Sequence, residues 1–303
     1  MRPSTNQVHC VICGDTGPVE RYPDELGSTR PTLDYSFSRE TRKTFRIVEC
    51  GNCTHQFVDP MPKLESSYSD VVDSVYLDSG RQRVATARHL IKRLKKFGAT
   101  SNGYLLDVGC NTGFFLDEAA KYFHCEGIEL SGWAADIARR RHKVHSLKLA
   151  EFQPAQKFDV VTLLGVIEHF EDPLSELERI AQLLLPNGLL VIFTGTRDSL
   201  LPRLLKKAWW WYQGMHLQYF TKSSLEKSVK LAGFDPVKWY THTAYFSLRS
   251  LRQSALRYPM ARLITIPLLA PGLRNLLIPI KVSGETILIA RKVATSNAVP
   301  NFN

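Results

Sequence analysis

One stretch constrains the fold of this chain more than any other: residues 104–130, YLLDVGCNTGFFLDEAAKYFHCEGIEL. A short apolar run ends at Val108 and is followed by Gly109, Asn111 and Gly113, residues that tolerate a left-handed backbone. Apolar residues at helical spacing come next and predict a helix over residues 114–123, and a second short apolar segment closes with Glu129. The order of strand, glycine-rich turn, helix, strand and acidic residue predicts a parallel sheet that holds a nucleoside-type ligand at the turn.

The glycine turn alone is a weak signal, because a dinucleotide-binding domain uses similar parts in the pattern G-x-G-x-x-G. Here the pattern is D-x-G-x-N-x-G, and the segments FDVVTLLGVIEHFEDP and LLLPNGLLVIFT follow it. In this order the segments resemble the class I S-adenosylmethionine-dependent methyltransferases. The resemblance covers residues 105–233 and a last strand near Ile287. It implies a Rossmann-like α/β fold, with a seven-stranded, mostly parallel sheet and helices on both faces.

The same resemblance implies a cofactor site. In that family the glycine turn lies against the methionine part of S-adenosylmethionine, and the acidic residue after the second strand binds the ribose. The turn that flanks the adenine falls here on Glu151 and Phe152, and Asn111 stands where glycine is commonest, a mild departure. The residues expected to bind the cofactor are Asp107, Gly109, Asn111, Gly113, Glu129, Leu130, Glu151, Phe152 and Gly165.

Candidate catalytic residues follow the fourth strand, whose carboxyl end faces the substrate in open parallel sheets. Glu168 and His169 lie in the phrase E-H-x-x-D-P, which resembles the ubiquinone-biosynthesis O-methyltransferases. There a glutamate three positions earlier completes a metal site, but Gly165 stands at that position here, which argues against a metal ion. The later phrase MHLQYFT places His216 in the loop that covers the acceptor in the resembling group. Each histidine is a candidate general base, with a structural role as the alternative.

Four cysteines near the start of the chain form two C-x-x-C pairs, Cys10 with Cys13 and Cys50 with Cys53. Four thiolates satisfy a zinc ion completely, so we expect a structural Zn²⁺ site rather than a catalytic one. Disulfides, a redox role and unligated thiols are the alternatives. The segment RIVECGNCTHQFVDPMP resembles the second knuckle of the zinc ribbons that precede some methyltransferases acting on sugars and on ribosomal RNA.

The expected organisation is a zinc ribbon over residues 1–62, a methyltransferase domain over 63–292 and a disordered tail over 293–303. The stretch from about residue 241 to 283 reads as a basic, apolar, proline-broken insertion. Its prolines and arginines argue against a helix that spans a membrane. A patch that lies on a membrane surface or a substrate lid is expected instead, and packing on the protein's own core or on a dimer partner is the alternative.

The net charge of +10 points to an anionic partner, such as RNA, an anionic lipid or a phosphorylated substrate. Residues 81–97 read as a basic helix with seven Lys or Arg and no acidic residue, and residues 199–225 also contain no acidic residue. An apolar stripe on this helix is expected to pack on the sheet: Val84, Ala87, Leu90, Ile91 and Leu94. The first residues do not resemble a signal peptide, so a cytoplasmic location is expected, with peripheral contact at the inner face of the membrane.

These observations favour O-methylation of a sugar or of a lipid-linked cell-surface glycan precursor. An RNA methyltransferase is the first alternative, because the basic helix and the zinc ribbon could grip phosphates. A ubiquinone-type small-molecule O-methyltransferase is the second. A non-catalytic binding module is disfavoured because Gly109, Gly113 and Glu129 are intact.

Overall fold

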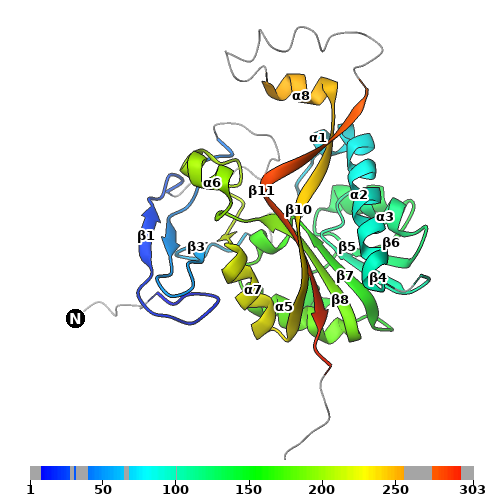
Figure 1. Ribbon diagram of the computed structural model, residues 1–303, viewed down its shortest axis with the longest axis horizontal. Helices are drawn as coiled ribbons and strands as arrows, with labels where there is room; N and C mark the ends of the chain where they lie inside the picture. The colour runs from blue at the N-terminus through cyan, green and yellow to red at the C-terminus, as the bar shows by residue number, and fades with distance from the viewer. Residues whose placement is uncertain are drawn as a thin grey trace, which may run out of the picture.

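A computed structural model describes residues 8–27, 31, 40–64, 68–99, 101–255 and 275–294 (Figure 1). The helices, 3-10 helices (η) and strands, in chain order, are β1 (Val19–Tyr22), β2 (Ile47–Glu49), β3 (Gln56–Val58), α1 (Ser74–Asp78), α2 (Gly80–Leu94), η2 (Lys95–Phe97), β4 (Tyr104–Val108), α3 (Phe114–Ala119), β5 (His124–Ile128), α4 (Gly132–Arg139), β6 (Lys143–His145), η3 (Leu149–Glu151), β7 (Phe158–Leu164), η4 (Ile167–His169), α5 (Pro173–Leu183), β8 (Leu184–Gly195), α6 (Leu200–Leu205), η5 (Lys206–Ala208), β9 (Gln218–Tyr219), α7 (Lys222–Leu231), β10 (Phe234–Ser247), α8 (Leu248–Ala255) and β11 (Leu277–Lys292).

The larger sheet has seven strands in the order β10-β11-β8-β7-β4-β5-β6. Strands β8, β7, β4, β5 and β6 run parallel to one another, whereas β11 is antiparallel to both β8 and β10. The central strands β4 and β7 are apolar and buried, as expected for a parallel sheet covered on both faces. The prediction of a seven-stranded, mostly parallel Rossmann-like sheet is confirmed.

Helices cover both faces of this sheet (Figure 1). On one face the buried side chains of α5 and α7 pack against β7, β8 and β11. On the other face α2, α3 and α4 do the same, and the apolar stripe predicted for the basic helix is largely buried, with Ala87, Leu90, Ile91 and Leu94 in the core. Burying a leucine or isoleucine side chain in this way stabilises the folded state by about 1.5–3 kcal/mol.

A second, four-stranded sheet has the order β1-β2-β3-β9 and contains the N-terminal ribbon. Strands β1 to β3 come from the first 58 residues, but β9 comes from the loop after η5. Gln56 and Phe57 pair with Tyr219 and Gln218, so the sheet crosses the predicted boundary between residues 62 and 63. The ribbon and the methyltransferase domain are therefore joined through backbone pairing as well as through side chains.

Strands β10 and β11 continue past the sheet as a two-stranded extension, which we call the hairpin arm (residues 243–247 and 277–281). Helix α8 follows its first strand, at the upper end of the molecule in Figure 1. The arm and α8 are the described parts of the predicted insertion. Residues 256–274 of that insertion, and residues 295–303 of the predicted tail, lie outside the described residues. Within the described ranges, every helix is too short or too polar to cross a membrane.

Candidate active site

The turn between β4 and α3 is built from three residues with positive φ: Gly109 at 72°, Asn111 at 47° and Gly113 at 86°. The backbone N–H of Gly109 donates to the carbonyl of Ile128 at 2.8 Å, which ties the turn to the end of β5. A Cβ atom on Gly109 would lie 2.5 Å from the Val166 side chain, so glycine is needed for this close approach. The turn thus has the shape that the sequence predicts for a ligand-binding loop.

Glu129 lies beside this turn with both of its carboxylate oxygens held in place. Its Oε2 accepts the N–H of Asn111 at 2.8 Å, and its Oε1 accepts the N–H of Ser131 at 2.8 Å. Burial raises the pKa of Glu129, and these backbone hydrogen bonds oppose the rise. Each carboxylate oxygen retains capacity for another donor, so the oriented, half-buried side chain can also accept hydroxyl groups of a ribose.

Asp107 is buried near the end of β4, two residues before Gly109. The hydroxyl of Thr162, on the neighbouring strand β7, donates to its Oδ1 at 2.6 Å. Burial raises the pKa of Asp107 to about 7; the Thr162 hydrogen bond opposes this rise and the charge of Glu129 adds to it. The carboxyl group can therefore change its protonation state near neutral pH when a charged ligand arrives.

Tyr76 is a residue of this region that sequence reasoning missed. It lies on α1, stacks on Phe114 with ring centroids 5.7 Å apart, and carries the guanidinium of Arg83 3.6 Å above its ring. Burial raises the pKa of Tyr76 to about 12, and the charges of Asp107 and Glu129 contribute to the rise. The phenol is thus within electrostatic reach of both acidic residues. The sequence did not indicate that Tyr76 belongs to this region, because α1 lies before residues 104–130, where the recognisable motif is found.

The residues predicted for the adenine side lie farther along the sheet edge. Phe152 is buried in the core, where its ring packs against His145 and Phe158. Glu151 is exposed, and its Oε2 accepts the N–H of Lys148 at 3.2 Å, which caps the 3-10 turn η3. Leu130 follows Glu129 directly and is half-buried. A cofactor role for Leu130, Glu151 and Phe152 stays a prediction.

The loop after β7 contains Gly165 and Glu168, and its Val166 lies against Gly109 in the turn between β4 and α3, which we call the cofactor turn. Gly165 has φ of 77°, and its N–H donates to the carbonyl of Phe193 at 2.9 Å. Glu168 is buried, and its Oε2 accepts the hydroxyl of Thr194 at 2.8 Å. Burial raises the pKa of Glu168 to about 8, a rise that the charge of Glu285 reinforces. The carboxyl group is therefore largely protonated at neutral pH in the absence of a cation.

The two candidate histidines lie side by side, although they are 47 positions apart in the sequence. The ring centroids of His169 and His216 lie 4.8 Å apart in an edge-on arrangement. Nδ1 of His169 lies 3.0 Å from the carbonyl of Met215, and Nδ1 of His216 lies 2.6 Å from the carbonyl of Trp211. Because a carbonyl oxygen only accepts, the contact with Trp211 places the proton of His216 on Nδ1 and leaves a lone pair on Nε2. Nδ1 of His169 also lies 2.9 Å from the Tyr68 hydroxyl, which can donate or accept, and its contact with the Met215 carbonyl favours the same tautomer.

Burial lowers the pKa of His169 to about 4 and holds the pKa of His216 well below its usual range. Both rings are neutral at pH 7 and able to take up a proton. Ligand atoms of Glu168, His169 and His216 all lie within 4.8 Å of one another, so the same three side chains could hold a divalent cation. Hydrogen bonding of each Nδ1 to a backbone carbonyl is the support that metal-binding histidines usually have.

Aromatic rings border this acceptor cluster, which comprises Glu168, His169 and His216. Phe193 packs against the rings of Trp211, at 5.9 Å, and His242, at 4.2 Å. The indole N–H of Trp211 and Nδ1 of His242 are buried and without a hydrogen-bond partner in the described part of the chain. The indole of Trp210 instead donates to Oε1 of Glu285 at 3.1 Å. Burial raises the pKa of Glu285 to about 7.

The four N-terminal cysteines converge as the sequence predicts. Their sulfur atoms lie within 4.8 Å of one another, with Cys10 and Cys53 3.5 Å apart and Cys13 and Cys50 3.6 Å apart, and all four are free thiols. Four sulfurs at about 2.3 Å from a tetrahedral zinc ion lie about 3.8 Å apart, so the quartet matches this geometry. A hydrogen bond from the Cys53 thiol lowers the pKa of Cys10 to about 5, which favours a thiolate.

A polar chain links the ribbon to the acceptor cluster. His55, buried two residues after Cys53, donates from Nε2 to Oε1 of Gln218 at 2.8 Å. The amide of Gln218 donates to the carbonyl of Phe170 at 2.9 Å, and the N–H of Leu217 donates to the carbonyl of Glu168 at 2.7 Å. The backbone on both sides of the cluster is therefore fixed by strand β9 and the ribbon.

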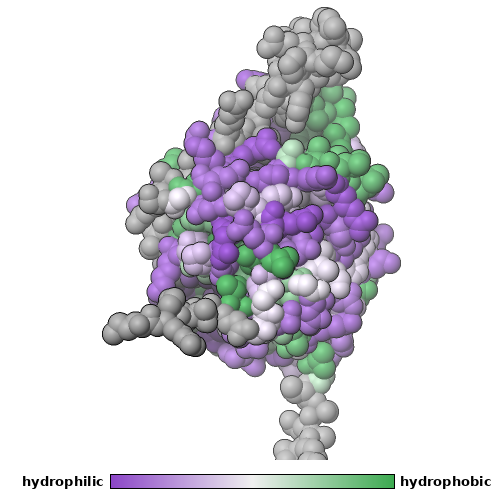
Figure 2. All heavy atoms as spheres, turned by 90° about the vertical axis from the view of Figure 1, so that its left-hand side faces the viewer, coloured by the Kyte–Doolittle hydropathy of each residue, from purple (hydrophilic) through white to green (hydrophobic). Residues whose placement is uncertain are grey.

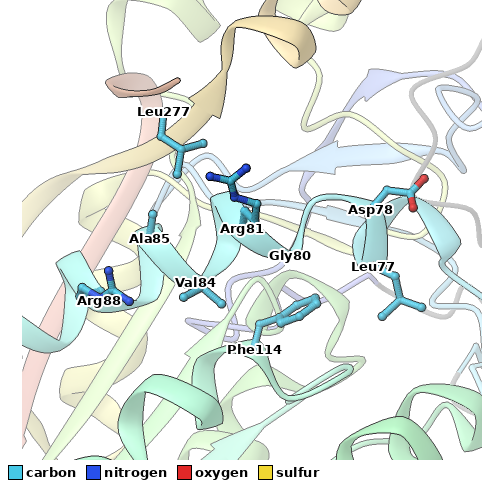
Figure 3. Close-up of a pocket in the computed structure, with 9 residues that line it drawn as sticks. All are labelled: Leu77, Asp78, Gly80, Arg81, Val84, Ala85, Arg88, Phe114 and Leu277. Carbon is cyan, nitrogen blue, oxygen red and sulfur yellow. The ribbon is translucent and has the colours of Figure 1, made fainter. Parts of the chain in front are cut away.

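A separate surface cavity of about 570 Å³ lies where α1, α2, α3 and β11 meet (Figure 3). It is lined by Leu77, Asp78, Gly80, Arg81, Val84, Ala85, Arg88, Phe114 and Leu277. Gly80 is required there, because a Cβ atom would lie 2.6 Å from the Phe114 ring. Residues predicted for the cofactor or for catalysis do not line this cavity.

Comparisons with known proteins give relatives over the central part of the chain. The protein is 35% identical over 104 residues to a ubiquinone biosynthesis O-methyltransferase of Aromatoleum aromaticum, which covers 31% of this chain and 44% of the relative. It is 30% identical over 155 residues to the protein of the same name from Cereibacter sphaeroides, covering 44% and 60%. The chain thus spans about half the length of the curated relatives it matches.

Solved structures include similar chains at low identity. A magnesium protoporphyrin IX methyltransferase from Synechocystis, with bound S-adenosylhomocysteine, gives a TM-score of 0.47 at 16% identity and covers 73% of this chain and 89% of its own. An amino pentose methyltransferase from Micromonospora echinaspora gives a TM-score of 0.44 at 16% identity, covering 74% and 99%.

A family model described as a methyltransferase domain matches residues 79–238, more than half of the 303 residues. The matched stretch contains the glycine turn, Glu129 and the acceptor cluster, and it begins at the N-terminal end of α2 and ends within β10. The chain therefore belongs to the methyltransferase domain family, with the fold of S-adenosylmethionine-dependent enzymes.

Proposed function

We propose that this protein transfers a methyl group from S-adenosylmethionine to a hydroxyl oxygen of a sugar, in a free or lipid-linked glycan precursor. The acceptor cluster carries this proposal: two neutral histidines, each with an open Nε2, lie beside buried carboxyl groups and aromatic rings. Aromatic rings pack on the apolar faces of sugar rings, and carboxyl groups bond to their hydroxyls. The cluster is adjacent to the cofactor turn, because Val166 touches Gly109.

The residues at the turn fit S-adenosylmethionine. Glu129 is oriented for ribose hydroxyls, and the positive φ values at Gly109, Asn111 and Gly113 open the backbone to a ligand. The hydroxyl of Thr112, next in the turn, is buried and has no hydrogen-bond partner among the described residues, so it is available to a ligand or a water molecule. When bound, the cofactor would supply a methyl group on a positively charged sulfur, whose bond to the methyl carbon breaks as the acceptor oxygen bonds to that carbon and the neutral thioether leaves.

The side chains of the cluster then serve to position the acceptor and to remove its proton. An acceptor hydroxyl within hydrogen-bond reach of Nε2 on His169 or His216 gives up its proton as the oxygen attacks. Met215 and Trp211 hold the rings through the Nδ1 hydrogens, so Nε2 is the basic atom in each case. Positioning supplies much of the remaining rate enhancement, since two reactants are held in one orientation.

A second candidate is methylation of a small phenolic hydroxyl, as in the ubiquinone biosynthesis O-methyltransferases that match at 30–35% identity. The group of Glu168, His169 and His216 favours it, because one carboxylate and two imidazoles could bind a divalent cation. The cation would hold the acceptor oxygen and lower its pKa. This mechanism requires a metal ion, whereas the sugar mechanism uses a histidine as base.

The two candidates are separated by an acceptor screen with methyl-labelled S-adenosylmethionine. Nucleotide-linked sugars, lipid-linked sugars and catechols are offered to the protein with Mg²⁺, with Zn²⁺ and with a chelator added at concentrations that leave the cysteine quartet loaded. Label in a sugar product that persists with chelator supports the proposed function. Label only in catechols, and only with a divalent cation, would replace it with the second candidate.

Glu129→Gln is expected to weaken S-adenosylmethionine binding about 10-fold to 100-fold, the cost of losing a charged hydrogen bond to the ribose. Isothermal titration calorimetry measures the dissociation constant. Glu126→Gln is the matched control, because Glu126 lies on β5, three residues before Glu129, and pairs with Lys143 and His145 away from the turn. Equal affinities in the two variants would remove Glu129 from the cofactor site.

Cofactor binding is expected to release about half a proton per molecule at pH 7. The pKa of Asp107 is raised to about 7 by burial, and a positively charged ligand beside it favours the ionised form, so its pKa falls on binding. Calorimetry in phosphate and in Tris detects the release as a difference in enthalpy. The difference should vanish in Asp107→Asn. An enthalpy independent of buffer in the wild type would contradict this role.

A further inference from the structure

Hydrophobic side chains stay exposed on α6, on α1 and directly before the second strand of the hairpin arm, elements that lie in the upper half of the molecule in Figure 1, which we call its upper end. On α6, Leu200 and Leu204 are 73% and 70% exposed. They are four residues apart and so project from the same side of the helix. In Figure 2 hydrophobic side chains gather at the upper right of the face shown, next to hydrophilic ones.

Two other elements add to this end. Val72, Val75 and Leu77 are exposed in and before α1, and Leu276 is exposed directly before β11. The remaining exposed large hydrophobic residues of the described chain are scattered singly on other elements, such as Val19 on β1 and Leu231 on α7. Leu77 of α1 and Leu277 of β11 line one cavity, and Pro202 of α6 packs against β11 at Gly284, so α1 and α6 both adjoin β11. Single exposed leucines are ordinary, but exposed apolar residues on elements linked in this way mark an interaction surface.

Positive charge surrounds these hydrophobic residues. The exposed basic side chains at this end are Arg81, Arg203, Lys206, Arg249 and Lys281. Exposed acidic side chains in the same elements are Asp70 and Asp78. Asp198 and Glu285 face inward, where they accept hydrogen bonds from the Lys222 N–H and the Trp210 indole. The local charge is therefore positive.

We propose that this end, the apical face, docks on the surface of an anionic lipid bilayer. Separate leucines that protrude from several elements suit a lipid interface, into which each can insert independently, and basic side chains suit the phosphate groups around them. A protein partner would require one continuous complementary patch. The docking requires no methyl transfer, so it goes beyond the proposed function and can be tested apart from it.

The position of α6 relative to the acceptor cluster gives this docking a consequence. Pro202 of α6 packs against β11, where a Cβ atom on Gly284 would lie 2.5 Å from its ring. The next residue, Glu285, bonds to Trp210 and adds its charge to the surroundings of Glu168. A bilayer held at α6 is therefore close to the cluster, within reach of a sugar attached to a lipid.

The test is co-sedimentation of the purified, zinc-loaded full chain with vesicles, without methyl donor. Wild type is expected to bind vesicles of phosphatidylglycerol and phosphatidylcholine, and to bind less when salt rises from about 50 to about 500 mM. The L200S/L204S variant should partition about tenfold more weakly, because two inserting side chains are lost. The R203Q/K206Q variant should lose the preference for anionic over pure phosphatidylcholine vesicles.

The matched control is V19S/L231S, whose two replaced side chains are 64% and 54% exposed but lie on other elements. It should bind as wild type does, and thermal unfolding checks that all variants fold. Wild type that stays in the supernatant, or L200S/L204S that sediments equally well, overturns the proposal. Dimerisation of wild type that L200S/L204S abolishes, seen by analytical ultracentrifugation without lipid, would assign the face to a second copy instead. Activity on a water-soluble acceptor is unaffected in every case.

Discussion

Replacing Cys50 with serine is expected to abolish zinc binding at the cysteine quartet and to lower the free energy of unfolding by about 4 kcal/mol or more. A metal ion that binds only the folded chain adds its binding free energy to folding. Cys50 also belongs to the same cluster of buried side chains as Phe220 and Leu225, on the methyltransferase side. The loss should therefore spread beyond the ribbon.

Zinc content per chain and denaturant-induced unfolding measure the two effects. Cys125→Ser is the matched control, since Cys125 lies on β5 outside the quartet and should leave the zinc content at one ion per chain. Acceptor methylation should fall before S-adenosylmethionine binding does when zinc is withdrawn slowly, because His55 and Gln218 connect the ribbon to the acceptor cluster. A zinc-free C50S protein as stable as C125S would show that the quartet is not a structural metal site.

Replacing both histidines of the acceptor cluster, in the H169Q/H216Q variant, is expected to lower kcat about 10²-fold to 10⁴-fold on the acceptor found in the screen. Each histidine, held through its Nδ1, has an unprotonated ring nitrogen that can take up the acceptor's proton, and the side-chain amide of glutamine cannot do so. The dissociation constant for S-adenosylmethionine should stay within about twofold, which also shows that the variant is folded. His124→Ala, an exposed histidine on β5, serves as the control.

The pH dependence tests the same assignment. Because burial lowers the pKa of His169 to about 4, wild-type kcat/KM for the acceptor, measured at saturating S-adenosylmethionine, should stay level from about pH 7, where Glu168 is already largely protonated, down to about pH 5. A decline centred near pH 6.5 would indicate a solvated histidine instead.

The same pKa shift makes the stability of the fold depend on pH. His169 binds more protons in the unfolded chain than in the folded one between pH 6.5 and 4, so the free energy of unfolding falls as pH falls through that window.

The cofactor half of the site was predictable because its residues are close in sequence. Asp107, the glycine turn and Glu129 all lie within 23 positions, and strand pairing of β4 with β5 brings the ends of that stretch together. The helix after the turn is shorter than predicted: apolar spacing suggested residues 114–123, but α3 ends at Ala119, and the chain turns early to reach β5. Local sequence patterns therefore predicted the order of strand, helix and strand correctly, but predicted the end of the helix less well.

The acceptor half could be predicted only in part. His169 and His216 were expected singly, but their contact depends on how the loop after η5 folds back, which no local pattern encodes. His242 on β10 and Glu285 on β11 were missed for the same reason. In the sequence the side chains of these strands look like ordinary sheet residues. Their proximity to Glu168 and Phe193 comes from sheet order alone.

The two-residue strand β9 imposes an order on folding during synthesis. The ribbon's cysteines and its first three strands leave the ribosome early, but the partner of β3 is made only when residues 218 and 219 appear. Until then Gln56 and Phe57 present an unpaired edge, of the kind that invites pairing with another chain. A ribbon that captures zinc early would keep this edge short and closed at one end while the remaining 160 or so residues emerge. The N-terminal module is thus the first to begin folding and among the last to finish.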